Sequence, residues 1–496
     1  MRVKRLFLGI LLSAIFVNII ASNYTPEGIS ISLKVPGNKA RRYPLALQKY
    51  QDGVYKCQSS EELPLIITRQ VVNQNGMQRI NVVIKALETV YFNYGEQIET
   101  GYKHSDCQFY MPGFWYRRNL RSPENTPSFK ISDSWLVRED RLSTPLTAVF
   151  CSSKAKSMSV IRLDKFDKEA LTTHKEGEVI VSGETSIGYT GFENVGGMTV
   201  LSYGFPYKEA PRTYIRKLTL APSVEAFQFL CKGDSITLAW ELSEIDVADF
   251  SECVQRTWEY CYDTYRPQSF NASYTADRMK EVLSNFFVDS YVDSTPTHYY
   301  SGVGLKTLTC DKTDVAEVGF LGRTLLNAFN ALEYGSLQNR SELVKDANNI
   351  FETYLSHGFS PAGFFNEVVR FHRDSKESNF SIRRQSEGVY AILSYLDYEK
   401  KHKRKHVEWE KRLKVILDNF LRIQKTDGSF PRKFKDDFSI VDSTGGSTPS
   451  VTLPLVMAYK YFNDKRYLES AKRSANYLEN EIISKSDYFS STLDAN

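Results

Sequence analysis

The chain has 496 residues, of which 42% are hydrophobic and 25% are charged, and its formal net charge is +4. This is the composition of a globular protein, and the length allows two large domains. The charge is near neutral for this size, and the one basic run, Lys400 to Lys405, is expected to be a solvated turn at a helix end. A nucleic-acid partner is therefore not predicted.

The first 22 residues have the pattern of a secretory signal. Three basic residues precede the apolar run Leu6 to Ile20, and the small residues Ala21 and Ser22 follow it. The run is short for a membrane span, although an uncleaved anchor stays an alternative. No later segment reaches about 18 apolar residues. We therefore expect an exported chain, periplasmic or extracellular, with no membrane span after removal of the signal.

Seven cysteines are widely spaced and form no C-x-x-C motif, which argues against a zinc ribbon or a thioredoxin-type site. Export would permit disulfides, but the sequence does not pair the cysteines. Our interpretation is that most of them are buried free thiols. No His or Asp cluster suggests a metal, and no phosphate-binding or dinucleotide motif is present, so no cofactor is predicted.

Residues 23–243 have the pattern of a β domain. Short runs rich in β-branched and aromatic residues are separated by Gly, Pro, Asn and Asp, without helices between them. This spacing predicts an antiparallel β-sandwich. The predicted strands are Ile29–Val35, Pro64–Val71, Ile80–Ile84, Leu146–Cys151, Val160–Leu163, Glu178–Ser182, Tyr214–Leu220 and Ser235–Trp240.

From residue 244 to residue 496 the hydrophobic period changes to that of amphipathic helices. The predicted helices are Val247–Tyr262, Ala276–Phe287, Val315–Leu332, Ser341–Tyr354, Arg384–Lys400, Val407–Ile423, Ser450–Phe462 and Arg466–Ile482. Short turns alternate with long loops at about 289–314, 358–383 and 425–449, so the long loops should gather at one end of the hairpins.

Hairpins that repeat every 65–70 residues or so stack into a solenoid or close into a toroid. We therefore expect a multidomain β and α protein, with a sandwich followed by an (α/α) toroid. About four hairpins are counted, whereas a closed ring of six would need roughly 130 more residues. The expectation is that the chain is a fragment or that the ring is open.

The stretch Ile382 to Leu396 joins polar chemistry to a buried helix. Arg383, Arg384, Gln385 and Glu387 crowd its first turn, and an apolar stripe follows. A carboxylate is favoured in the first turn of a helix by the helix dipole. Glu387 is therefore the first candidate for a catalytic carboxylate.

Two further acids on the long loops are catalytic candidates. Glu367 lies among apolar residues that could raise its pKa, and Asp427 opens a Gly-containing turn. Asp442 precedes a pliable loop and is a candidate for substrate binding. Glycoside hydrolysis needs two facing carboxylates, one an acid and the other a base or nucleophile. Each acid also has an ordinary structural alternative: a helix-end charge for Glu387, a pair with Arg370 for Glu367, and turn residues for the two aspartates.

Basic and aromatic residues complete the predicted site. The guanidinium groups of Arg383, Arg384 and Arg432 suit a carboxylate ligand, which suggests an acidic sugar. His298 and Tyr300 could line a sugar site, although a structural role is the commoner one for such residues. The predicted substrate-binding set consists of these five residues together with Gln385 and Asp442.

The order of a sandwich followed by helical hairpins resembles that of bacterial glycoside hydrolases that carry an (α/α)6 toroid behind an N-terminal β-sandwich. Four stretches of the second half carry the similarity to proteins of polysaccharide-degrading bacteria. They are Ile382–Tyr390, Thr426–Arg432, Gly445–Ser450 and Tyr488–Asn496. Those proteins look related to glucuronidase-type families. The resemblance covers about 315–496, and the sandwich only by its layout. It implies hydrolysis of a polysaccharide at a uronic acid, and it assigns no role to an individual acid.

Three functions are left open by the sequence. The first is an exported glycoside hydrolase that uses two carboxylates. The second is a polysaccharide lyase in which a base such as His298 or Tyr300 removes a proton next to a uronate carboxylate. The third is a glycan-binding protein without activity. Sugar, linkage, stereochemistry and oligomeric state do not follow from the sequence.

Overall fold

The structure is a computed structural model, and its chain divides into two compact units, Met1–Gln268 and Ser269–Asn496. It describes residues 28–484 except 58, 75, 121–124, 165–166, 170–175, 217–218, 267–272, 295–296, 301–302, 305–310, 313–314, 318–323 and 371–378. The predicted signal and the stretch Tyr488–Asn496 lie outside the described residues. No helix among the described residues is long and apolar enough to cross a membrane.

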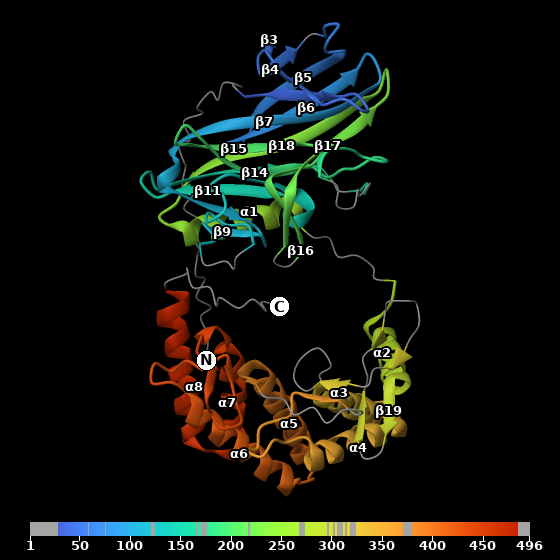
Figure 1. The fold of residues 1–496 in the computed structure, drawn as a ribbon, viewed down its shortest axis with the longest axis vertical. Coiled ribbons are helices and arrows are strands. Elements are labelled where there is room, and N and C mark those ends of the chain that lie inside the picture. The colour runs from blue at the N-terminus through green and yellow to red at the C-terminus, as the bar shows by residue number, and fades with distance from the viewer. Residues whose placement is uncertain are drawn as a thin grey trace, which may run out of the picture. The chain divides into compact units, whose positions relative to one another are not determined.

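Two nine-stranded sheets make up most of the first unit (Figure 1). The first has the order β13 (Gly177–Ile180), β17 (Thr219–Leu230), β16 (Lys208–Arg216), β10 (Trp135–Arg138), β14 (Tyr189–Val195), β15 (Met198–Phe205), β7 (Val90–Lys103), β1 (Ser30–Lys34) and β2 (Arg41–Pro44). The second has the order β3 (Gln48–Gln51), β4 (Val54–Cys57), β5 (Leu65–Gln74), β6 (Met77–Ala86), β18 (Ser235–Asp246), β12 (Lys156–Arg162), β11 (Leu146–Cys151), β8 (Cys107–Met111) and β9 (Trp115–Arg117).

Buried residues of both sheets form one hydrophobic core. On β6 every second residue from Ile80 is buried, because side chains of a strand alternate between its two faces. Phe109 of β8 stacks on Phe192 of β14 with 3.8 Å between ring centroids. The ring centroids of Trp240 on β18 and Tyr203 on β15 are 5.0 Å apart. The predicted β domain is therefore present, with two sheets around a shared core.

The predicted strand Tyr214–Leu220 is wrong in its bounds, because β16 ends at Arg216 and β17 begins at Thr219. The chain turns back there, and the two strands pair with each other in antiparallel register. The long strand β7 was not predicted. From Tyr94 to Tyr102 every second residue is buried, but the polar residues Glu96 and Thr100 are among them and conceal the apolar pattern.

Helix α1 (Phe250–Tyr265) belongs to the first unit, although a domain boundary was expected at residue 243/244. The Asp249 side chain caps it by accepting a hydrogen bond from the Glu252 amide. Its buried face, which includes Phe250 and Cys253, shares a small core with Ala148 of β11. The two units therefore meet in sequence after α1 and not before it.

The second unit is built from helical hairpins. Its helices are α2 (Ala276–Ser290), α3 (Thr324–Leu337), α4 (Ser341–His357), α5 (Ile382–Lys401), α6 (Val407–Ile423), α7 (Pro449–Phe462) and α8 (Lys465–Tyr477). Short turns join α3 to α4, α5 to α6 and α7 to α8. Helices α3, α5 and α7 pack side by side, as do α4, α6 and α8, so the hairpins form two layers over one core.

Short strands connect the loops of the second unit. They are β19 (Tyr291–Ser294), β20 (Thr297–Tyr300), β21 (Val303–Gly304), β22 (Asp311–Lys312), β23 (Val315–Glu317), β24 (Val368–Arg370), β25 (Phe380–Ser381), β26 (Lys433–Phe434) and β27 (Ile440–Asp442). The predicted helix Val315–Leu332 is wrong in its first part, because Val315–Glu317 pairs as β23 with β24. Pairing with a distant strand overrides the local pattern there.

Candidate active site

The start of α5 is fixed by a small three-stranded sheet. Ser381 of β25 lies opposite Lys433 of β26, and β26 pairs in turn with β27. The Ile382 amide at the start of the helix donates to the carbonyl of Arg432 at 3.1 Å. The helix then buries Val389, Ile392, Leu393 and Leu396 in the core of the unit. The long loops before α5 and before α7 therefore meet at the first turn of α5, as their alternation predicted.

Gln385 holds the loop before β24 against α5. Its side chain is fully buried, its Oε1 accepts from the Phe365 amide at 2.8 Å, and its Nε2 donates to the Phe365 carbonyl at 2.8 Å. Nε2 also lies 3.1 Å from Glu367 Oε1. The side-chain amide of Gln385, predicted to bind substrate, is thus hydrogen-bonded to the backbone of Phe365. It accepts from the N–H group and donates to the C=O group, as a neighbouring β-strand residue would.

Glu367 is buried at the same place, with a side chain that is 2% exposed. Its Oε1 accepts from the Ser381 amide at 2.5 Å, and its Oε2 lies 3.4 Å from Nη1 of Arg384. An ion pair between Glu367 and Arg370 was the alternative, but the side chain of Arg370 is outside the described part of the structure. A carboxylate with partners on both oxygens supports the start of α5 and orients Arg384.

Glu387 differs from Glu367 in having a free oxygen. Its Oε1 lies 3.3 Å from Nε of Arg383, one helical turn before it on the same face. Its Oε2 is buried and has no hydrogen-bond partner among the described residues. A buried carboxylate oxygen without a partner is costly, so such an atom calls for an explanation such as a ligand.

Arg432 and Asp442 form a second ion pair on the same sheet, with 2.7 Å between Nε and Oδ2. The other oxygen of Asp442 accepts from the amide and the hydroxyl of Thr444. Burial raises the pKa of Asp442, but these hydrogen bonds and Arg432 outweigh burial and hold the pKa below its ordinary value. Asp442 is therefore ionised at neutral pH and holds Arg432 beside the start of α5.

Asp427 stabilises a turn. Its Oδ1 accepts from the amide of Ser429 at 2.9 Å and from its hydroxyl at 2.7 Å. Burial raises the pKa of Asp427, and the hydrogen bonds from Ser429 outweigh burial and lower it overall. Its other oxygen lies 3.6 Å from Lys425, which donates to the carbonyl of Ser443 beside Asp442. The turn is thus linked to the Arg432–Asp442 pair, and about half of the Asp427 side chain is exposed.

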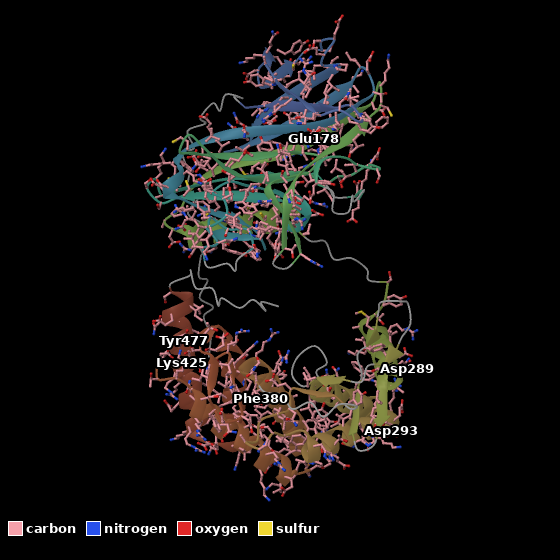
Figure 2. All side chains as sticks on the ribbon, in the orientation of Figure 1. Glu178, Asp289, Asp293, Phe380, Lys425 and Tyr477 are labelled. Atoms are coloured by element: carbon pink, nitrogen blue, oxygen red, sulfur yellow. The ribbon has the colours of Figure 1, made fainter. Side chains whose placement is uncertain are left out.

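His298 lies on another hairpin of the unit, β19–β20, which packs on α3 and α4. Its Nδ1 lies 2.9 Å from Oδ1 of Asp293, and its ring stacks on Tyr291. Figure 2 shows Asp293 well apart from Phe380 of β25. The predicted Tyr300 lies on β20, and its side chain is outside the described residues.

The structure therefore brings most of the predicted residues together at one place. The name "α5 site" is used below for Glu367, Arg383, Arg384, Gln385, Glu387, Arg432 and Asp442. Asp427 is joined to this site through Lys425, whereas His298 belongs to the hairpin beside α3 and α4. Within the described residues, no group of three or more His, Cys, Asp and Glu side chains could hold a metal ion.

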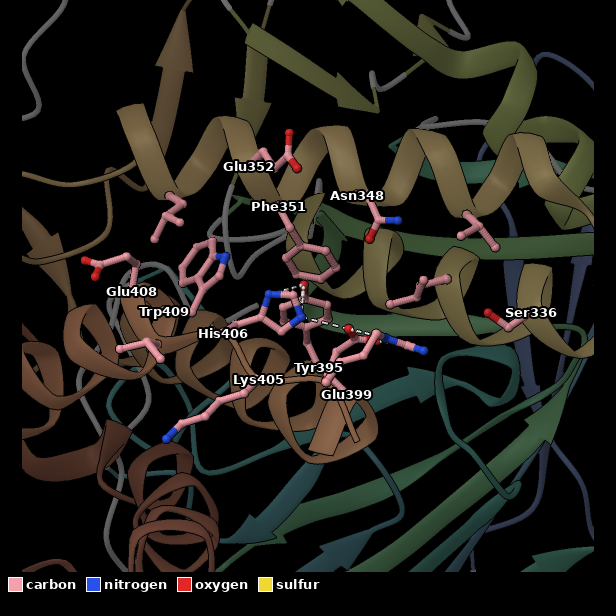
Figure 3. A pocket seen from close by; sticks show the side chains of 15 residues that line it. Ser336, Asn348, Phe351, Glu352, Tyr395, Glu399, Lys405, His406, Glu408 and Trp409 are labelled. Atoms are coloured by element: carbon pink, nitrogen blue, oxygen red, sulfur yellow. Dashed lines mark hydrogen bonds and ion pairs between the residues drawn. The ribbon is translucent and has the colours of Figure 1, made fainter. Parts of the chain in front are cut away.

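A cavity of about 820 Å³ lies at the opposite end of α5, and the sequence did not predict it (Figure 3). Phe351, Tyr395 and Trp409 are buried beside it. Glu399 accepts from Nε of Arg404 and from Nε2 of His406, both at 2.7 Å. The basic run Lys400 to Lys405 is exposed at the end of α5, as expected, and its Arg404 also bonds to the buried carboxylate of Glu399. Glu387 and Glu399 are about 18 Å apart along the helix axis, so the cavity is separate from the α5 site.

Comparisons with known proteins give structural likenesses at low sequence identity. No family model matches the chain, and no curated protein matches it. A cellobiose 2-epimerase from Bacillus thermoamylovorans is 14% identical, with a TM-score of 0.33 over 41% of this chain and 53% of that chain. A possible member of the GH105 family from Klebsiella pneumoniae is 13% identical, with a TM-score of 0.33 over 42% of this chain and 55% of that chain.

A polysaccharide lyase is 9% identical, with a TM-score of 0.33, and the match covers 91% of this chain and 75% of that chain. The chain spans about half of the length of the first structures that it matches. All of these names belong to carbohydrate-active enzymes. Each TM-score is below 0.5, so these likenesses assign neither a fold nor an activity to this chain.

Proposed function

We propose that the chain is an exported glycoside hydrolase that acts on a polysaccharide at a uronic acid, with Glu387 as the reacting acid. The observation that carries this proposal is the buried, unpartnered Oε2 of Glu387 beside Arg383. In the proposed reaction the protonated carboxyl of Glu387 donates its proton to the oxygen of the leaving sugar. The free oxygen is the atom that this transfer requires.

The second carboxylate in this proposal is Asp427. Its lowered pKa keeps it ionised at neutral pH, and half of its side chain is exposed, as a base or nucleophile requires. The side chain of Glu367 is 2% exposed and bonds to Arg384, so we assign Glu367 the positioning of Arg384 instead. This division revises the sequence-based expectation that Glu367 and Asp427 are equal candidates.

Three arginine side chains support an acidic sugar as the substrate. Arg383, Arg384 and Arg432 flank the start of α5, and each pairs with a carboxylate of the protein. Arginine holds carboxylates through planar, two-point hydrogen bonds, so a uronate can share these groups. We also infer that the first unit is a β-sandwich and that the hairpins of the second unit belong to an (α/α) toroid. The two layers of helices in the second unit fit such a ring.

A polysaccharide lyase is the second candidate, because Nδ1 of His298 lies 2.9 Å from Oδ1 of Asp293, and a histidine beside a carboxylate is a possible general base. Glycan binding without catalysis is the third. The variant Glu387→Gln separates the three, since it keeps the shape of the side chain and removes its proton chemistry.

The test compares wild type with Glu387→Gln on uronic-acid-containing polysaccharides, with reducing-sugar release as the readout. We expect the variant to lose activity by a factor of about 10²–10⁴, the usual contribution of a general acid. Glu469→Gln, an exposed change on α8, is the matched control and should keep full activity. Undiminished activity of Glu387→Gln would overturn the role of Glu387. Glycan binding by both proteins without turnover would favour the third candidate.

A further inference from the structure

Two cysteines of the first unit lie directly opposite each other in the second sheet. Cys107 begins β8 and Cys151 ends β11, and the antiparallel register pairs them. Opposite residues of an antiparallel pair point to the same face, with Cα atoms about 4.5–5.5 Å apart. A disulfide needs Cα atoms about 4.4–6.8 Å apart. The backbone therefore already provides the separation that a disulfide requires.

The surroundings of the two thiols favour a pair as well. Both residues are 0% exposed and belong to the core between the two sheets. Cys107 Sγ donates to the Lys103 carbonyl at 3.3 Å, and Cys151 Sγ lies 3.4 Å from Ser153 Oγ. The Cys151 thiol also lies close enough to act on the pKa of Cys107. Each sulfur thus lies beside the other, on the same face of the sheet.

No other two described cysteines lie opposite each other in a sheet. Cys57 is half-buried on β4 and Cys231 is exposed after β17. Cys253 and Cys261 lie on one face of α1, two helical turns apart, which is too far for a bridge within a helix. Cys310 is outside the described residues. Among the described cysteines, the register therefore selects Cys107 and Cys151.

We propose that Cys107 and Cys151 form a cross-strand disulfide when the chain folds in an oxidising compartment. The segment between them runs from β8 through β9 to β10 of the first sheet and returns to β11. The disulfide would close this segment into a covalent loop. It would stabilise the first unit chiefly by restricting the unfolded chain.

The bond forms by thiol–disulfide exchange with a small disulfide such as oxidised glutathione. One cysteine thiolate attacks the oxidant and releases one glutathione thiolate, which leaves a mixed disulfide. The second cysteine thiolate attacks the protein sulfur of that intermediate and releases the second glutathione. The two cysteines lose two protons and two electrons, which oxidised glutathione takes up as it becomes two molecules of reduced glutathione. Because burial raises the pKa of Cys107 to about 12, the exchange belongs to the folding chain, before the sheet closes over the thiols.

The test refolds the full chain in a buffer of reduced and oxidised glutathione, followed by proteolysis without reductant and mass spectrometry. We expect one linked peptide that joins Cys107 to Cys151, and its loss after reduction. The refolded chain should unfold with a midpoint about 5–15 °C higher than that of a Cys107→Ser/Cys151→Ser variant. Cys57→Ser is the control and should keep the linked peptide.

Two results would overturn the proposal: both thiols free in the refolded chain, or either thiol linked to another cysteine. Peptide mapping of the unmodified chain gives this answer even if the double variant fails to fold. The outcome is independent of the α5 site, since that site lies in the second unit. It is also independent of export, because the oxidant is supplied in the buffer.

Discussion

Gln385 is the residue on which the geometry of the α5 site depends. One amide satisfies both backbone groups of Phe365 and one oxygen of Glu367, and all of these atoms are buried. Glu367 in turn holds the Ser381 amide and Arg384. The position of the arginine therefore rests on a side chain that does not need to touch a substrate.

For Gln385→Ala we expect a loss of about 2–4 kcal/mol in the free energy of unfolding, because several buried polar groups lose their partner together. Urea unfolding measures this loss. The exposed Gln338, just after α3, provides the control, and Gln338→Ala should change the free energy by less than about 0.5 kcal/mol. A loss for Gln385→Ala as small as that of the control would show that the bridge does not form.

At the scale of elements, α5 carries a polar cluster at each end. Its first two turns carry Arg383, Arg384, Gln385 and Glu387 of the α5 site, although Glu387 was expected in the first turn. Its last turns hold Glu399, which accepts hydrogen bonds from Arg404 and His406 of the turn into α6. Burial raises the pKa of Glu399, but the hydrogen bonds from Arg404 and His406 outweigh burial and lower it overall. These bonds tie the last turns of α5 to the turn that leads into α6.

The lowered pKa predicts how the stability of this hairpin depends on pH. A carboxylate whose pKa is lower in the folded state stabilises the fold above its unfolded pKa, and the contribution is lost as pH falls through the folded pKa. The ordinary pKa of this group is 4.5. Glu399→Gln should therefore cost about 1–3 kcal/mol at pH 7, and the difference from wild type should shrink below pH 4.5. Urea unfolding at pH 7 and pH 4 measures it. A difference that is equal at both pH values would contradict the assignment.

For the molecule as a whole, the two units have separate hydrophobic cores. Among the described residues, the last buried side chain of the core between the sheets is Leu242, and the first of the helical core is Tyr299. Units with their own cores unfold as separate cooperative blocks.

Calorimetry of the full chain should therefore show two transitions. Ile84→Ala, in the β6 core, should lower only one of them, and Leu393→Ala, in the α5 core, should lower only the other, each by about 5–15 °C. A common shift of both transitions by either variant would show that the units unfold together.

The helices of the second unit could be predicted from the sequence because their apolar stripes are long and regular, as in α5 and α6. Strands such as β7 and β23 could not, because buried polar residues or distant pairing decide them. At the α5 site the sequence predicted which residues meet, since all of them lie at helix starts or in the long loops. It could not predict that Glu367 is buried and Glu387 has a free oxygen, because these depend on contacts between segments 14–20 residues apart.

The most direct test of the proposed hydrolase is the chemistry of its products. The purified chain is incubated with uronic-acid-containing polysaccharides, and both reducing ends and the ultraviolet absorbance of unsaturated uronates are followed. Hydrolysis through Glu387 predicts reducing ends without new absorbance. Absorbance that rises together with the reducing ends would contradict it and would transfer the reaction to a lyase base such as His298.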